Sequence, residues 1–400
     1  MDSASADGGP LSTVFTRHLG HRVHIATFAR PSKYLLHLAL SVQRSGGALN
    51  VLGARDDLAP VPPEFKISDA VGVAHNITFA YGQLDGKEEK ELGYRRILFK
   101  RLLFLWRLAK QLPPEDLLLY VDGNDVLFQR PVSSAVSTWQ ELVAADTKGS
   151  EAVIFMGYPN CAGRFDKDLK QVLYPLGPAA SARGFVRGGA ACARWRTAQP
   201  RGSFPFLDSG GYLGRASAVF QVLEDALELA RLGLDYICMS ALTVAGIRLG
   251  PSRLRVDTEA ALFYSMRPAD HGNFGNWSPE TARRFCEPGY FDRHGLPPAL
   301  TLTGETPTVL HFVGPSKWYF LHRCMSAFLE QRRAELEGGV PSSPFAGPEG
   351  AFCRFSRASG AGGEPSEVCE GTYGTFVYFD VDREQLMRYP MDLGMLSAAA

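Results

Sequence analysis

The stretch LLLYVDGNDV, residues 117–126, decides how the rest of the chain is interpreted. Its first five residues are all apolar, which predicts a strand buried on both faces of a sheet. Gly123 then permits a tight turn, and Asp122 and Asp125 stand three residues apart where the strand ends. In open α/β sheets ligands bind at this carboxyl edge. We therefore expect a functional site here.

Asp122 and Asp125 are candidate metal ligands. Carboxylate oxygens suit Mg²⁺ or Mn²⁺, and either ion would bridge to phosphate oxygens. The alternative is a plain turn between two strands, because Asp, Gly and Asn are ordinary turn residues. An EF-hand fails on spacing, since Val126 and Ser133 stand where it needs oxygen ligands. Asn124 stands where an aspartyl-phosphate enzyme would carry its second acid.

The surrounding pattern predicts an α/β fold. Strand 23–29, helix 32–44 and strand 48–54 form a β-α-β opening, which favours parallel pairing. Further strands are expected at 126–128, 152–157, 308–312 and 375–381, and helices at 88–111, 215–231, 236–246 and 317–336. Residues 158–203 are expected to be rich in loops.

Three regions are expected along the chain. Residues 1–20 form a flexible N-terminus, residues 21–336 one α/β domain, and residues 337–400 a Gly-, Pro- and Ser-rich linker with a C-terminal tail. A length of 400 residues alone would predict about two to three domains. The motifs described below span most of the chain, however, and favour a single main unit.

Composition excludes some functions. Lys and Arg number 42 and Asp and Glu number 42, so the chain lacks the basic excess of a dedicated nucleic-acid binder. Charged residues make up 21% and hydrophobic residues 45%, which argues for a packed core rather than wholesale disorder. No stretch approaches about 18 uninterrupted apolar residues, so no transmembrane segment is expected.

The signals for cellular compartment conflict. Residues 1–22 lack the apolar core of a secretory signal, which favours the cytoplasm. The seven cysteines show no CxxC pair and no zinc-site spacing, and their odd number leaves at least one thiol free. Glycosylation sequons occur at 76–78 and 276–278. A luminal protein whose leader is missing therefore stays as the alternative.

Two more segments place polar side chains beside glycines. In FLDSGGYLG, residues 206–214, the glycines permit close approach of a ligand and the Asp and Ser could bind hydroxyls. The alternative is a turn before helix 215–231, and the segment lacks the Lys and spacing of a P-loop. In HFVGPSK, residues 311–317, His311 could ligate a metal and Lys317 could meet a phosphate. A lone His is otherwise a structural residue.

In order and spacing these segments resemble the glycosyltransferase domain of the procollagen-lysine hydroxylases, multifunctional lysyl hydroxylase/collagen glycosyltransferases with a GT-A fold. That family carries an Ala-Thr pair in its first strand, then a strand with DxxDV, (L)NSGG(F/Y)xG and HGNGP(T/S)K. Here these are Ala26-Thr27, VDGNDV, LDSGGYLG and HFVGPSK. The resemblance covers roughly residues 20–320. It implies a nucleotide-diphospho-sugar transferase whose mixed, mostly parallel sheet is flanked by helices.

The resemblance also implies roles for the matching residues. Asp122, Asp125 and His311 would hold Mn²⁺, or Mg²⁺, on the diphosphate of a UDP-sugar. The donor-binding residues would be Thr27 and Lys100 at the uridine, Asp208, Ser209, Gly210 and Gly211 at the sugar, and Gly314 and Lys317 of the last motif. Lys317 would add electrostatic stabilisation.

Asp235 matches the last position of an acidic run near the family's acceptor site. If the reaction inverts, a carboxylate base is needed, and Asp235 and Asp208 are the candidates; a retaining reaction needs none. The chain departs from the family at Asn124, where an aromatic stacks on uracil, at Val313, where Asn stands, and at Asp208, which replaces the Asn of NSGG.

These observations give the hypothesis of a metal-dependent galactosyl- or glucosyltransferase that moves a hexose from a UDP-sugar to a hydroxyl acceptor on a protein or glycan, hydroxylysine of a collagen-like protein being one such acceptor. The alternative is a non-catalytic nucleotide-sugar or carbohydrate-binding module with the same fold, which Asn124 and Val313 favour. A metal-dependent phosphohydrolase is a third interpretation, but no water-activating base stands beside DGND. The resemblance favours the lumen of the endoplasmic reticulum or Golgi.

Overall fold

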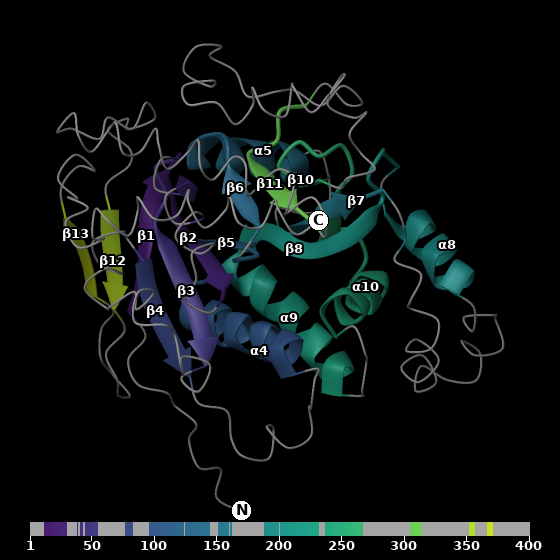
Figure 1. Ribbon diagram of the computed structural model, residues 1–400, viewed down its shortest axis with the longest axis horizontal. Helices are drawn as coiled ribbons and strands as arrows, with labels where there is room; N and C mark the ends of the chain where they lie inside the picture. The colour runs from purple at the N-terminus through teal and green to yellow at the C-terminus, as the bar shows by residue number, and fades with distance from the viewer. Residues whose placement is uncertain are drawn as a thin grey trace, which may run out of the picture.

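The structure is a computed structural model, and it describes residues 12–29, 38, 41–42, 45–54, 77–82, 96–123, 125–144, 151–159, 161, 188–199, 201–231, 237–266, 305–313, 352–356 and 366–370. Within these ranges the chain is a mixed α/β fold, with a ten-stranded sheet, a three-stranded sheet and flanking helices (Figure 1).

The strands are β1 (Ser12–His18), β2 (His21–Phe28), β3 (Leu49–Ala54), β4 (Ile77–Gly82), β5 (Leu117–Val121), β6 (Val126–Phe128), β7 (Val153–Tyr158), β8 (Phe206–Arg215), β9 (Leu254–Asp257), β10 (Phe263–Met266), β11 (Val309–Phe312), β12 (Phe352–Ser356) and β13 (Ser366–Glu370). The helices are α4 (Arg96–Gln111), α5 (Val132–Ala144), α8 (Gly188–Ala198), α9 (Ala216–Arg231) and α10 (Ile237–Leu249).

The large sheet mixes parallel and antiparallel pairs. Its order is β13-β12-β1-β2-β5-β8-β7-β9, with β3 on β2 and β4 on β3. The β-α-β opening is confirmed in its pairing, because β2 runs parallel to β3 and to β5. By contrast, β8 runs antiparallel to both β5 and β7, and β1 runs against β2. The pairing is therefore less parallel than expected.

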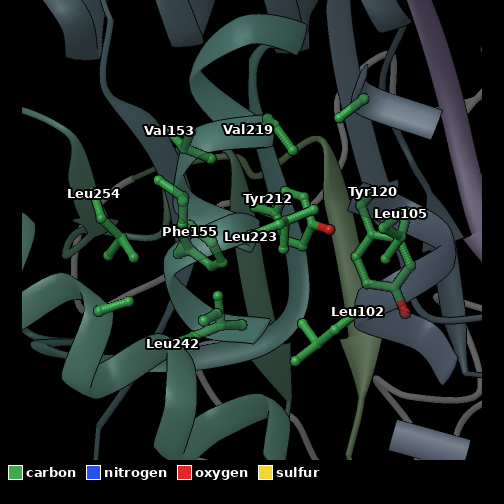
Figure 2. Packing of buried hydrophobic residues seen from close by; sticks show 14 of the residues in the cluster. Leu102, Leu105, Tyr120, Val153, Phe155, Tyr212, Val219, Leu223, Leu242 and Leu254 are labelled. Carbon is green, nitrogen blue, oxygen red and sulfur yellow. The ribbon is translucent and has the colours of Figure 1, made fainter. Parts of the chain in front are cut away.

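The central strand β5 is buried on both faces, which explains its all-apolar sequence. Leu118 and Tyr120 belong to one hydrophobic cluster, whereas Leu117, Leu119 and Val121 belong to the other. Helices α4, α9 and α10 cover the first face, and α5 with the three-stranded sheet lies on the second (Figure 1). Figure 2 shows the first cluster, where side chains of the three helices surround Tyr120, Phe155 and Tyr212.

Most expected elements in the described ranges are confirmed to within a few residues. They are the strands at 23–29, 48–54, 117–121, 126–128, 152–157 and 308–312, the helices at 215–231 and 236–246, and the described part of 88–111. The helix expected at 317–336 and the strand expected at 375–381 lie outside the described residues, as does most of the helix expected at 32–44. Helix α5 was not expected.

Strands also occur where composition indicated flexible segments. Strand β1 lies in the expected N-terminal segment, and β12 and β13 lie within residues 337–400. The two late strands pair with each other, and β12 pairs antiparallel with β1. The Gly, Pro and Ser that suggested a linker are also the residues of hairpin turns, so composition alone does not separate the two. The domain boundaries themselves stay a prediction.

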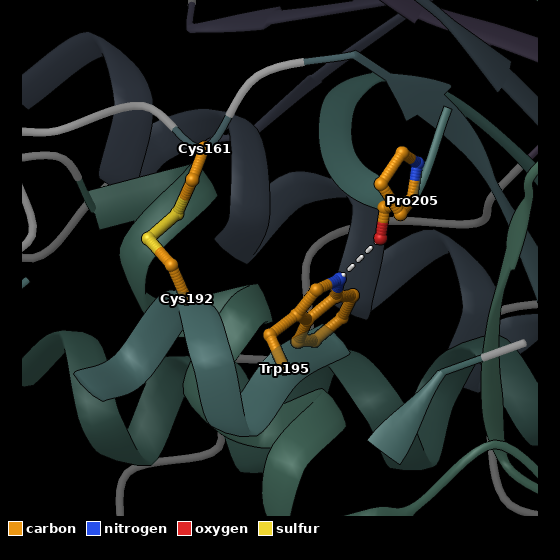
Figure 3. Close-up of a disulfide and its surroundings, with 4 residues drawn as sticks. All are labelled: Cys161, Cys192, Trp195 and Pro205. Atoms are coloured by element: carbon orange, nitrogen blue, oxygen red, sulfur yellow. Dashed lines mark hydrogen bonds between the residues drawn. A yellow bond between two sulfur atoms is a disulfide. The ribbon is translucent and has the colours of Figure 1, made fainter. Parts of the chain in front are cut away.

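Helix α8 lies in the stretch expected to be rich in loops, and a disulfide holds it there. Cys161, after β7, is bonded to Cys192 of the helix, with 6.0 Å between their Cα atoms (Figure 3). Trp195 of the same helix is buried and donates from Nε1 to the carbonyl of Pro205 at 2.7 Å. A Cβ on Gly246 of α10 would come within 2.6 Å of this indole. Helix α8 is therefore packed closely against α10.

Among the described residues, no helix is both long enough and apolar enough to cross a membrane.

Asp257 fixes the turn from β9 to β10. Its side chain is 1% exposed, and its two carboxylate oxygens accept hydrogen bonds from the backbone N–H groups of Ala261, Leu262 and Phe263 at 2.7–2.9 Å. Burial raises the pKa of Asp257 from 3.8 to about 6, although the three donors oppose the change.

This pKa predicts a stability that depends on pH. Because the folded-state pKa exceeds the unfolded value, the contribution of Asp257 is complete below the unfolded pKa and is lost as pH rises through about 6. When the pH is lowered from about 7 to about 5, the unfolding free energy of the native chain should rise by about 1 kcal/mol relative to that of Asp257→Asn. Urea unfolding of both proteins at the two pH values measures this gain. A constant difference between them would contradict it.

Candidate metal and ligand site

The carboxylate pair lies where the chain passes from the large sheet to the small one. Strand β5 ends at Val121, and β6 belongs to the sheet β10-β11-β6, so Asp122 and Asp125 connect the two sheets. Strand β11 runs antiparallel to β6 and places His311 opposite Val126. Strand β8 lies beside β5 and places Gly211 opposite Val121. Tertiary structure thus joins the three motifs at one junction.

Backbone hydrogen bonds tie these segments together. The N–H of Asp122 donates to the carbonyl of Gly210 at 2.9 Å, and the N–H of Phe312 donates to the carbonyl of Asp125 at 2.7 Å. Both aspartates are therefore fixed through their main chains, one to β8 and one to β11.

Asp122, Asp125 and His311 form a group that could hold a metal ion. Their candidate ligand atoms all lie within 4.8 Å of one another. His311 Nε2 is 3.6 Å from Asp122 Oδ2 and 3.5 Å from Asp125 Oδ1. Asp125 and His311 are buried, whereas the Asp122 side chain is 27% exposed. The expectation that these three residues meet is confirmed, and the site opens on the side of Asp122.

The local charges fit a divalent cation. Burial by itself lowers the pKa of His311, but Asp125 and Asp208 outweigh it and raise that pKa well above 6.5. Without a metal His311 is therefore protonated, and the three carboxylates, the Arg101 guanidinium and the imidazolium carry one net negative charge. A metal ion on Nε2 would replace that proton, and the site would then carry two negative charges. An ion such as Mn²⁺ or Mg²⁺ would balance that charge, and oxygen and imidazole donors suit it.

Asp208 faces the other side of the His311 ring. Its Oδ2 lies 3.7 Å from His311 Nδ1 and accepts a 2.6 Å hydrogen bond from Ser265 Oγ, while Oδ1 accepts from the N–H of Gly210 at 2.9 Å. Burial would raise the pKa of Asp208, but His311, Ser265 and Gly210 outweigh it and lower that pKa. Asp208 is therefore buried beside the imidazole, although its distance from Nδ1 is too long for a hydrogen bond. Its expected role as a base stays a prediction.

Arg101 and Tyr120 hold the other oxygen of Asp122. Arg101 Nη1 and Tyr120 Oη each donate to Asp122 Oδ1 at 2.6 Å, which leaves Oδ2 turned toward His311. Arg101 Nη2 also donates to Ser209 Oγ at 2.9 Å. Burial raises the pKa of Tyr120 well above 10, so its hydroxyl keeps the proton that it donates.

Sequence reasoning missed both residues. Arg101 was one of several basic residues around a helix, and Tyr120 one member of an apolar strand. A signal did exist, because Arg101 follows Leu98 by three residues and precedes Leu105 by four, and so lies on the apolar stripe. A charged residue on such a stripe is buried and needs polar partners inside the fold. Arg101 is accordingly only 8% exposed.

Two glycines of the motifs are required by close packing. A Cβ on Gly210 would overlap the His311 ring, and a Cβ on Gly123 would overlap Ala29 and come within 2.9 Å of Thr27 Oγ1. Thr27 is fully buried, and its Oγ1 has no hydrogen-bond partner among the described residues. Gly211 packs against Met156 and Phe263. These glycines permit the close approach of backbone that the sequence suggested.

The remaining expected site residues are not placed. Lys100 belongs to α4, but only its backbone is described. Asn124, Asp235, Gly314 and Lys317 lie outside the described residues. Their roles stay predictions.

Comparisons with known proteins do not assign the chain to a family. No protein-family model matches it. None of the curated proteins matches it significantly. The fold and site define an α/β protein with a candidate Asp-Asp-His metal centre.

Gly210→Ala should weaken Mn²⁺ binding by at least about 10-fold, because the new methyl group displaces His311 from the two aspartates. Titration of the purified protein with Mn²⁺, followed by electron paramagnetic resonance of the free ion, measures the affinity. Gly214→Ala is the matched control on the same strand, since its methyl group meets Val153 instead. Equal Mn²⁺ affinity in both variants would contradict the placement of His311.

Arg101→Lys should weaken Mn²⁺ binding by about 10-fold, because lysine keeps the charge but cannot bridge Asp122 and Ser209 with a planar fork. Arg107→Lys, on the same helix beside Phe104, is the control and should bind Mn²⁺ like the native chain. Calorimetric titration with Mn²⁺ compares the three proteins. An unchanged affinity in Arg101→Lys would show that this bridge does not position Asp122.

Proposed function

We propose that the chain is a metal-dependent glycosyltransferase with a GT-A-type fold, which moves a hexose from a UDP-sugar to a hydroxyl acceptor. The observation that supports this most is the meeting of VDGNDV, LDSGGYLG and the His of HFVGPSK at one junction between two sheets. The same three segments carry the resemblance to the glycosyltransferase domain of procollagen-lysine hydroxylases.

The chain's own side chains would build the metal site in two layers. Asp122 Oδ2, Asp125 and His311 Nε2 would hold Mn²⁺ or Mg²⁺, which neutralises charge on a departing diphosphate when bound. Around them, Arg101 and Tyr120 orient Asp122 through hydrogen bonds, and the Asp208 carboxylate lies 3.7 Å from His311 Nδ1. Such preorganisation matters because the ligands need not rearrange when charge develops.

The donor would lie over the exposed side of Asp122. Strand β2 runs parallel to β5 and places Ala26 opposite Tyr120, so Thr27 lies beside the start of the site. Its hydroxyl is buried without a partner among the described residues, and its contact with the nucleoside is proposed on the resemblance. Ser209, Gly210 and Gly211 would face the sugar, and Lys100, Gly314 and Lys317 stay in the proposal on the resemblance alone.

The acceptor hydroxyl would be the nucleophile, and hydroxylysine of a collagen-like protein is the acceptor that the resemblance favours. If the reaction inverts, Asp235 is the better base, because Asp208 already uses both of its oxygens. The Cys161–Cys192 disulfide supports a luminal compartment, since disulfides are rare in the cytosol.

The test is release of UDP from common UDP-hexoses in the presence of Mn²⁺. The native chain should release UDP, chelation of the metal should abolish release, and Asp125→Ala should lower the rate by at least about 100-fold. Asp225→Ala is the control, because Asp225 lies on α9 and pairs with Arg248. A native rate equal to that of Asp125→Ala would overturn the proposal.

The same assay separates the alternatives. A non-catalytic module would bind UDP in a calorimeter without releasing it from any UDP-hexose. A phosphohydrolase would release inorganic phosphate from UDP or simple phosphate esters. Mass spectrometry of acceptor peptides then identifies a transferred hexose.

A further inference from the structure

The β12–β13 hairpin brings two cysteines together. In its antiparallel register Cys353 stands directly opposite Cys369, between the pairs Phe352 with Glu370 and Arg354 with Val368. The two strands extend the large sheet beyond β1. Along the chain 15 residues separate the two cysteines, so their spacing does not indicate that they form a pair.

The backbone register is compatible with a disulfide. Residues directly opposite on antiparallel strands share one face of the sheet, with Cα atoms about 4.5–5.5 Å apart. Disulfides span Cα separations of about 4.4–6.8 Å, so this pair could be bonded without moving the backbone. The pair also continues a row across the sheet, because Cys353 stands opposite Phe15 of β1, whose side chain is fully buried.

The chain already contains one disulfide, Cys161–Cys192, which involves helix α8. Helix α8 lies on the opposite side of the fold from β12 and β13 (Figure 1). A protein that keeps one structural disulfide is in a compartment where other well-placed thiol pairs also oxidise. The residues between the two strands include three glycines, so a covalent tie would remove much chain entropy that packing must otherwise offset.

We propose that Cys353 and Cys369 form a second disulfide, which closes the β12–β13 hairpin on the edge of the large sheet. The two thiols lose two protons and two electrons to an external disulfide, such as oxidised glutathione or that of a thiol–disulfide oxidoreductase, which becomes two thiols. Cys238, Cys286 and Cys324 are the cysteines outside the two bonds. This proposal does not depend on the proposed glycosyltransferase function.

Tryptic peptide mapping without reduction tests the bond directly. Trypsin cleaves after Arg354 and Arg357, so Cys353 falls on peptide 334–354 and Cys369 on peptide 358–383. The full chain is kept in a glutathione redox buffer until peptides 149–164 and 188–194 are fully linked through Cys161 and Cys192, which is the internal control. Free thiols are alkylated before digestion.

The expected result is a linked species of 334–354 and 358–383 that is lighter by two hydrogen atoms than the sum of the two peptides and separates on reduction. Alkylated Cys353 and Cys369 in a digest where the control link is complete would overturn the proposal. A link from either cysteine to Cys238, Cys286 or Cys324 would overturn it equally.

Hydrogen exchange tests the consequence for the hairpin. Cys353→Ser should accelerate amide exchange in 352–356 and 366–370 by at least about 10-fold, because the tie that limits local opening is lost. The matched variant Cys369→Ser should show the same acceleration, and the double variant no more than either. Mn²⁺ affinity should not change. Exchange as slow in Cys353→Ser as in the native chain would contradict the bond.

Discussion

Burial of β5 on both faces is the constraint on which the rest of the structure depends. Its alternate side chains pack into two separate hydrophobic clusters, and the one polar group on its side chains, the Tyr120 hydroxyl, is bonded to Asp122. Polar chemistry begins where the strand leaves the sheet, at Asp122. Because the chain then enters a second, smaller sheet, the next carboxylate, Asp125, is brought beside β11 and His311. The position of the site follows from where the buried strand ends.

The charges at this junction depend on one another. Asp125, Asp208 and His311 are all buried, and a buried carboxylate is costly unless it is paired and hydrogen-bonded. Asp208 accepts hydrogen bonds from Ser265 and a backbone N–H, and Asp125 lies 3.5 Å from His311 Nε2. The partly exposed Asp122 accepts from Arg101 and Tyr120. Once a metal ion replaces the proton on His311, the set carries two negative charges. The packing is therefore compatible with a divalent cation.

At the edge of the large sheet, strand pairing attaches a segment that has no apolar pattern. Strands β12 and β13 come from a stretch whose composition indicates turns and linkers, yet β12 pairs with β1 and β13 pairs with β12. Main-chain hydrogen bonds do not require apolar side chains. A segment without a hydrophobic pattern can therefore still form a strand at the edge of a sheet. The proposed bond between Cys353 and Cys369 would stabilise the paired β12–β13 hairpin.

The sequence by itself determined the elements whose side chains face one environment along their whole length. The all-apolar β5, helix α9 and the described part of α4 were predicted because local periodicity reports burial. It also determined the pair Asp122 and Asp125 and the order of the three motifs. Only the tertiary structure decided which side chains surround them. Arg101, Tyr120 and Ser265 reach the site through strand and helix packing, and α8, β1 and the late hairpin depend on a disulfide or on pairing between distant strands. Such long-range contacts leave no local period in a sequence, because partners distant along the chain determine them.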